Sequence, residues 1–303
     1  MSFRTLVLAL LLLPAIFLGA CGVQQRTFDT PEAAVAALQT AVADDNRDEL
    51  RSLFGSRSDE LRSGDPEQDR TDFVAFSSKI TERTVLQESA DNQKILLVGE
   101  EGWPFPVPLV SQNNRWRFDT DTGIEVLTDR RIGENELATI DALRAFVIAE
   151  REYQAVPRYS DGIRTYTTRL MSTPGQRDGL FWETAENEDP SPIGPVMAMA
   201  VARTGGEGTP EPYYGYLYKA LTRQGPAAPG GAMDYMENNL LTRGVAAVAF
   251  PSQWGRTGIM TFIVSVEGAI YQRDLGPDTA SIVAAMDTFN PDEGWTRVDT
   301  SNQ

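Results

Sequence analysis

The chain has 303 residues, a hydrophobic fraction of 41% and a formal net charge of −16, from 27 basic and 43 acidic side chains. This length and composition allow two ordinary domains with real cores and exclude a wholly disordered protein, while the excess of acid argues against a nucleic-acid partner. Histidine is absent and cysteine occurs once, which excludes disulfides, thiolate metal clusters and imidazole bases, so we predict no metal site and no cofactor.

Residues 1–20 have the pattern of an export signal peptide. A basic Arg4 precedes an apolar run over residues 6–17, and Leu18-Gly19-Ala20-Cys21 follows it. The apolar run is too short for a comfortable membrane span. The sequence therefore predicts a leader that is removed from the mature protein.

The single cysteine, Cys21, lies where the leader ends. Leu-Gly-Ala-Cys resembles the bacterial lipobox, which implies a diacylglyceryl group on Cys21 as a membrane anchor. A free cysteine after an ordinary cleavage site is the alternative. Gly22 does not resemble an inner-membrane retention signal, so we expect a lipid-anchored protein of the cell envelope, on the outer membrane facing the periplasm.

After a tether over residues 21–27, residues 28–127 read as one α+β domain. Thr30 is a good N-cap and Pro31 fits the first turn of a helix. Further helices and strands at 84–86, 94–98 and 115–119 follow, and residues 119–123 read as a turn. N-terminal helices before a curved antiparallel sheet are similar in outline to the cone-shaped NTF2-like domain, which implies a cone that could hold a small ligand.

A long helix ends near Tyr153 and begins near Arg130. Bulky side chains fall on one side of this helix and small ones on the other, and both sides are therefore predicted to be buried. The bulky set is Leu137, Ile140, Leu143 and Val147, and the small set is Ala138, Ala142, Ala145 and Ala149. We expect Asp141 and Glu152 on the exposed strip.

Residues 128–303 are predicted to form a second α+β domain, in which this helix packs on a four-stranded antiparallel meander. The strands lie at 213–222, 244–250, 258–266 and 269–273, with Tyr214, Tyr216 and Tyr218 on one face of the first. A final helix runs from Thr279 to about Phe289. A helix on such a meander is similar to the head of type IV pilins and pseudopilins, but the long apolar helix half that builds a pilin filament is missing.

Several short motifs are shared with one family. They are Trp103-Pro104-Phe105-Pro106, Arg130-Arg131-Ile132-Gly133-Glu134-Asn135-Glu136-Leu137, Ser172-Thr173-Pro174-Gly175, Asp178-Gly179-Leu180, Gln224-Gly225-Pro226, Pro229-Gly230-Gly231-Ala232 and Gly258-Ile259-Met260-Thr261-Phe262. The combination resembles the DUF2950 family of bacterial exported proteins, over nearly the whole mature chain. This resemblance implies no particular activity.

Few residues form a pattern that could carry chemistry, and no phosphate loop or serine nucleophile motif occurs. Arg131 and Glu136 are candidates for a charge network at the start of the central helix, although carboxylates favour helix starts in any case. Asp178 with Trp182 and Glu183 could bind or hydrolyse a glycan. Four aromatic residues, Trp182, Tyr213, Tyr214 and Trp254, form a further candidate set. They could form an exposed binding rim, or they could fill a core.

These observations favour a non-catalytic binding or scaffold component of the envelope, with an envelope protein or a glycan as its partner. A small-ligand-binding protein that uses the N-terminal cone is the first alternative. A carboxylate-dependent glycan hydrolase built on Asp178 and Glu183 is the second, and it lacks the usual imidazole.

Overall fold

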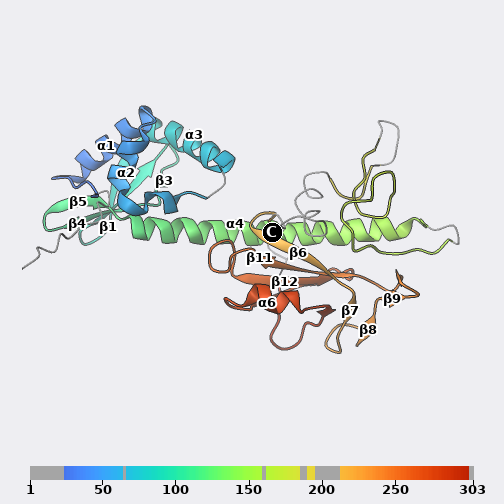
Figure 1. Ribbon diagram of the computed structural model, residues 1–303. Coiled ribbons are helices and arrows are strands. Elements are labelled where there is room, and N and C mark those ends of the chain that lie inside the picture. The colour runs from blue at the N-terminus through green and yellow to red at the C-terminus, as the bar shows by residue number, and fades with distance from the viewer. Residues whose placement is uncertain (1–23, 64–65, 159–161, 185–189, 195–211, 300–303) are drawn as a thin grey trace, which may run out of the picture. The chain divides into compact units, whose positions relative to one another are not determined.

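The computed structural model describes residues 24–63, 66–158, 162–184, 190–194 and 212–299. The expected α+β class is confirmed (Figure 1). The chain divides into two compact units, Met1–Val126 and Leu127–Gln303. The predicted signal peptide and Cys21 lie outside the described residues.

The N-terminal unit combines helices with one antiparallel sheet. Its helices are α1 (Pro31–Ala43), α2 (Arg47–Phe54), the 3-10 helix η1 (Gly55–Leu61) and α3 (Pro66–Glu82). Its strands are β1 (Thr84–Ala90), β2 (Gln93–Val98), β3 (Trp103–Pro104), β4 (Leu109–Gln112) and β5 (Arg115–Phe118), in the order β1-β2-β4-β5, with β3 also paired to β2. Thr30 caps α1 as predicted, since its side chain accepts the Ala33 N–H at 3.2 Å.

Aromatic rings occupy much of the core of this unit. The Phe105 ring lies 4.9 Å from Phe76 and 6.4 Å from both Phe54 and Phe118, measured between centroids. Phe54 and Phe118 are themselves 5.3 Å apart. The helices and the sheet therefore pack on each other through a shared set of buried side chains.

The long helix α4 runs over 36 residues, Thr120–Ala155. The predicted turn at 119–123 is wrong, because residues 120–123 form the first turn of α4. Asp119 accepts the Thr122 hydroxyl at 3.0 Å through its side chain and the Gly123 N–H at 3.0 Å through its carbonyl. A Cβ on Gly123 would lie 2.6 Å from the side chain of Val107. This glycine permits close packing inside the N-terminal unit rather than a turn.

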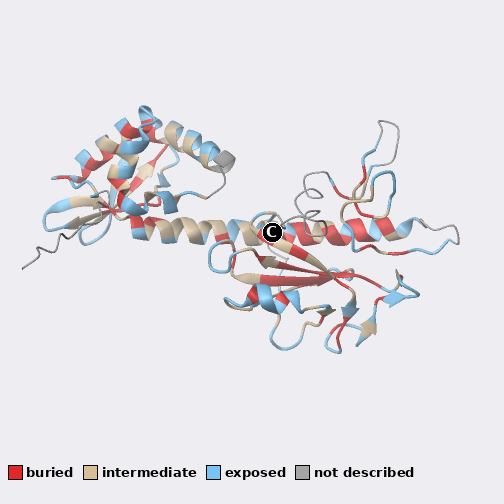
Figure 2. Ribbon diagram, in the orientation of Figure 1, coloured by how far each residue is buried: buried red, intermediate tan, exposed pale blue. Residues whose placement is uncertain are grey.

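Burial along α4 follows most of the predicted pattern. Buried and exposed stretches alternate along the part of α4 that belongs to the C-terminal unit (Figure 2). Ala142 and Ala149 are only 6% and 0% exposed, while Asp141 and Glu152 are exposed, as expected. The prediction is wrong for Leu137, which is 52% exposed. The stripe of bulky residues that packs on the C-terminal sheet begins only at Ile140.

The C-terminal unit contains the predicted meander. Strands β6 (Tyr216–Leu221), β11 (Ala246–Pro251), β12 (Met260–Ser265) and β13 (Ile270–Asp274) pair antiparallel in this order, and the short β15 (Thr296–Arg297) adds to β13. Within this unit, α4 lies on one side of the sheet and α6 (Thr279–Ala284) on the other (Figure 1). In the five-stranded sheet, β6 is an edge strand.

Smaller strands complete this unit. β7 (Arg223–Gln224) lies between β8 (Met233–Asp234) and β14 (Thr288–Phe289), and β9 (Met236–Glu237) pairs with β10 (Leu240–Leu241). The final helix is therefore shorter than predicted, since it ends at Ala284 and residues 288–289 are extended. Among the described residues, we find no helix whose length and hydrophobicity would let it cross a bilayer.

Candidate ligand-binding site

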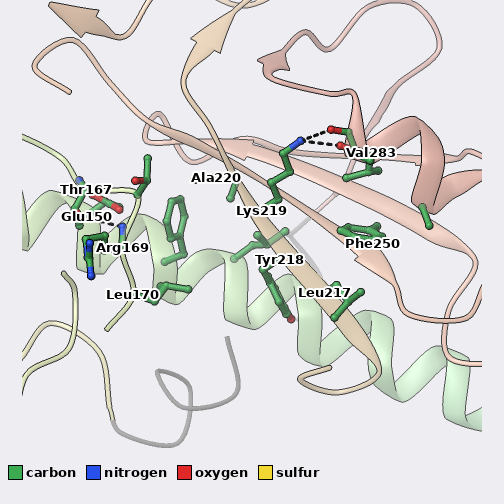
Figure 3. Close-up of a pocket in the computed structure, with 16 residues that line it drawn as sticks. Glu150, Thr167, Arg169, Leu170, Leu217, Tyr218, Lys219, Ala220, Phe250 and Val283 are labelled. Carbon is green, nitrogen blue, oxygen red and sulfur yellow. Dashed lines mark hydrogen bonds between the residues drawn. The ribbon is translucent and has the colours of Figure 1, made fainter. Parts of the chain in front are cut away.

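A cavity of about 440 Å³ lies in the C-terminal unit, along the edge strand β6. One wall is α4, with Phe146 and Glu150, and another is the segment of residues 167–170. Four consecutive residues of β6, 217–220, line the cavity together with Val283 of α6. Figure 3 shows Glu150, Thr167 and Arg169 at one end of this group, away from Phe250 and Val283.

Glu150 is the unusual residue of this wall, because its side chain is 0% exposed. Its Oε2 accepts the Thr167 N–H at 3.1 Å, and its Oε1 has no hydrogen-bond partner among the described residues. Burial raises the pKa of Glu150 to about 8, against the opposing effect of the Thr167 N–H. The carboxyl group is therefore mostly protonated at neutral pH and carries a hydrogen-bond donor.

The position of Glu150 follows from helical periodicity. Residues 143, 146, 147, 150 and 153 all face the core, and four of these five positions hold large apolar or aromatic side chains. Glu150 is the acid in that stripe, one turn after Phe146. An acid at an apolar position is visible in the sequence, but no motif marks it as functional. Its hydrogen-bond partner lies 17 residues away in a segment without regular structure.

The two cations that line the cavity have partners elsewhere. The Lys219 Nζ donates to the carbonyls of Val283 at 3.0 Å and Ala284 at 2.8 Å, at the end of α6 (Figure 3). The Arg169 Nε lies 3.6 Å from the Asp178 Oδ2. Within the part of the chain that the structure describes, Glu150 forms no ion pair with either of them.

Contrary to the prediction, Arg131 and Glu136 do not lie at a helix start, because α4 begins at Thr120 and both residues lie inside it. Arg131 is half-buried on this helix. Glu136 has a structural role, since its Oε1 accepts the N–H groups of Ile259 and Met260, each at 3.0 Å. It therefore fastens α4 to the beginning of β12.

Asp178 organises the loop that precedes it. Its Oδ1 accepts the Thr173 N–H at 2.7 Å and its Oδ2 accepts the Thr173 hydroxyl at 2.8 Å. Burial acts in the opposite direction, but these bonds and the Arg169 charge hold the pKa of Asp178 below its ordinary value. Asp178 is therefore ionised at neutral pH and has its oxygens engaged within the loop.

Trp182 is mostly buried, at 9% exposure. The Arg158 guanidinium lies 4.8 Å from the centre of its indole ring and the Arg177 guanidinium 5.4 Å from it. Of the two interpretations of the aromatic set, core filling holds for this residue. Asp178 and Trp182 thus have separate structural contacts.

Tyr214 lies outside β6, in the turn between Tyr213 and Tyr216, with a positive φ of 47°. The expectation that it shares a face with Tyr216 and Tyr218 is therefore wrong. It is 54% exposed, and its ring packs 4.6 Å from that of Tyr213. Trp254 is 39% exposed, and its Nε1 donates to Asp274 at 2.8 Å.

The described residues contain no group of three or more acidic or cysteine side chains placed to hold a metal ion. A family model, described as "Protein of unknown function (DUF2950)", matches residues 25–298. The chain belongs to the DUF2950 family. No curated protein and no solved structure matches it. The DUF2950 match includes the whole cavity, the Glu136 contacts and the Asp178 loop.

Proposed function

We propose that this DUF2950 protein is an envelope lipoprotein, anchored through Cys21 to the outer membrane and facing the periplasm, and that it binds a ligand without catalysing a reaction. The lipobox-like sequence before Cys21 supports the anchor. The cavity beside Glu150 supports the binding role. In this proposal the cavity of the C-terminal unit is the ligand site.

The observation that carries the binding role is the fully buried carboxyl group of Glu150 in the wall of a mainly apolar cavity. A buried polar group without its full set of hydrogen bonds costs about 1–3 kcal/mol. An apolar side chain at this helix position would avoid that cost, so the stability of the fold does not explain the carboxyl group. Polar groups of this kind in otherwise apolar pockets commonly orient ligands.

The cavity supports a ligand site in the C-terminal unit better than in the N-terminal cone. Its volume of about 440 Å³ falls in the range of about 300–1,000 Å³ that is common for small-molecule sites. In the N-terminal unit, the rings of Phe54, Phe76, Phe105 and Phe118 pack against one another in the core, which argues against an open cone that holds a ligand there.

Hydrolysis of a glycan through Asp178 and Glu183 receives less support. A general acid in such an enzyme needs a raised pKa, whereas the pKa of Asp178 is lowered and its oxygens are engaged by Thr173. The exposed Tyr214 and Trp254 are instead a surface on which an envelope protein or a glycan partner can pack.

Filling the cavity tests the proposed function. The full chain is placed in lipid nanodiscs and titrated with the neutral fluorescent dye Prodan, with protein-free nanodiscs as the blank. We expect saturable binding that Ala220→Trp weakens at least tenfold, because Ala220 lines the cavity. Ile282→Trp on α6 is the control, since Ile282 is 41% exposed and lies outside the lining. Equal binding by both variants would place the dye elsewhere and count against the proposal.

A further inference from the structure

We infer that the cavity binds a neutral, largely apolar molecule with one hydrogen-bond acceptor, such as a ketone, ester or amide carbonyl, and that Glu150 donates to this acceptor through Oε1. This inference rests on the proposed function, because it names the ligand class of the same site. It goes beyond that function because it names Oε1 of Glu150 as the atom that recognises the ligand.

The hydrogen bonds of Glu150 decide which oxygen faces the ligand. Oε2 accepts the Thr167 N–H at 3.1 Å and is therefore the carbonyl-like oxygen of the neutral acid. The proton then belongs on Oε1, which has no partner among the described residues. An acceptor on a bound molecule would satisfy this donor and remove the penalty for burying it alone.

The groups around the carboxyl favour a neutral ligand. Burial raises the pKa of Tyr166, whose phenol interacts with Glu150 and is uncharged at neutral pH. The charged side chains that line the cavity beside Glu150 are Arg169 and Lys219. These two positive charges disfavour a cationic ligand. Both already have partners, Asp178 for Arg169 and the carbonyls of α6 for Lys219, so an anion would enter a mainly apolar cavity without a free counter-charge.

The remaining wall is suited to an apolar body. Leu143 and Phe146 of α4, Leu217 of β6 and Phe250 of β11 contribute hydrocarbon surface to the cavity. The Glu150 side chain is 0% exposed in this conformation, so the carboxyl turns toward the cavity when the ligand binds. Rotation about the last bond of a glutamate side chain is soft, which makes this adjustment small in energy.

Three para-substituted fluorobenzenes of similar size test the ligand class. They are 4-fluoroacetophenone, which carries an acceptor, 1-ethyl-4-fluorobenzene, which has none, and 1-(4-fluorophenyl)ethylamine, which is a cation. Their ¹⁹F NMR lines are followed with the full chain in nanodiscs, against protein-free nanodiscs. At pH 7 we expect the ketone to bind at least tenfold more tightly than the ethyl compound, with the amine weakest.

Variants at Glu150 assign the effect to this residue. Glu150→Gln keeps a donor and should retain the preference for the ketone within about threefold, whereas Glu150→Leu should abolish it. The wild-type donor is present below the Glu150 pKa of about 8 and is lost above it. Ketone affinity should therefore fall about tenfold between pH 7 and pH 9 in the wild type, and stay constant in Glu150→Gln.

The outcomes separate this inference from the proposed function. Equal binding of the ketone and the ethyl compound at pH 7, or amine binding at pH 7 that is tighter than ketone binding, would overturn the ligand class and leave the cavity as a binding site. If none of the three probes binds beyond the nanodisc blank, the proposed function itself fails. Should Glu150→Leu not fold, the pH dependence of the wild type and of Glu150→Gln still decides.

Discussion

The carboxyl group of Glu150 loses its water when α4 packs in the C-terminal unit, and a single N–H replaces it. Because its folded pKa of about 8 exceeds the ordinary value of 4.5, the folded state holds a proton that the unfolded state releases between these two pH values. Stability therefore falls as pH rises from about 4.5 to about 8, by at most about 1.4 kcal/mol per pH unit.

Glu150→Gln removes this titration. We expect the variant to gain stability over the wild type as pH rises from 5 to 8 in urea unfolding at pH 5, 6.5 and 8, and the difference to level off in a further measurement above pH 8. Glu152→Gln, on the exposed strip of the same helix, is the matched control and should show little pH-dependent change. A difference that does not vary with pH would mean that Glu150 is not the buried acid.

Glu136 is the second residue whose contacts allow a sharp prediction. Glu136→Ala removes the one oxygen that accepts both the Ile259 and the Met260 N–H groups, and we expect a loss of about 1.5–3 kcal/mol, the range for a hydrogen bond to a charged group. Glu136→Gln keeps a carbonyl oxygen and should lose less. Glu134→Ala, at an exposed position, should stay within about 0.5 kcal/mol of the wild type in urea unfolding.

At the residue scale, the sequence predicted features that depend on near neighbours. The Thr30 cap and the burial of Ala142 and Ala149 follow from spacing within one helix. The roles of Glu136 and Glu150 depend on partners 123 and 17 residues away, and no local pattern specifies such partners.

At the scale of elements, two glycines of α4 have opposite requirements. Gly133 is exposed, and a Cβ added there would meet no atom within 4 Å, so Gly133→Ala should stabilise the protein by about 0.5–1 kcal/mol through helix propensity. Gly123→Ala should destabilise it, because its Cβ would lie 2.6 Å from the side chain of Val107. Thermal unfolding of the two variants should shift in opposite directions, and a stabilising Gly123→Ala would contradict the packing described for Val107.

The element boundaries show why local composition misleads. Asp119-Thr120-Asp121-Thr122-Gly123 has the composition of a turn, yet it begins α4 because the Asp119 side chain and the close packing of Gly123 stabilise a helix there. The meander was predictable, since its strands alternate and Glu267-Gly268 connects two of them. The end of α6 was not predictable, because residues 288–289 pair with β7, which lies more than 60 residues earlier in the chain.

At the scale of the whole molecule, the proposed anchor should decide where the protein is found. Cys21→Ser should lose the lipid-dependent removal of the leader, because the acceptor of the proposed diacylglyceryl group is gone. Cell fractionation and the mass of the N-terminal peptide measure this, with Gly22→Ala as the control that should stay anchored. Normal processing and membrane retention of Cys21→Ser would refute lipidation.

The overall class was predictable from the order of elements, whereas the cavity was not. Its wall joins α4, the segment 167–170, strands β6 and β11 and helix α6. Each of these segments reads as an ordinary helix, strand or loop. The cavity exists only because the meander brings residues of α4 and α6, more than 100 positions apart, to the same edge strand.

The contacts of Lys219 also determine how partners of this protein can be found. The chain has three lysines, Lys79, Lys94 and Lys219, and the first two belong to the N-terminal unit. Lys219 is the one lysine that the sequence places in the C-terminal unit. It donates to two carbonyls at the end of α6 and should react slowly. Lysine-directed cross-linkers would therefore capture neighbours of the N-terminal unit alone. A reagent that couples carboxyl groups, such as a carbodiimide with a dihydrazide, would report on both.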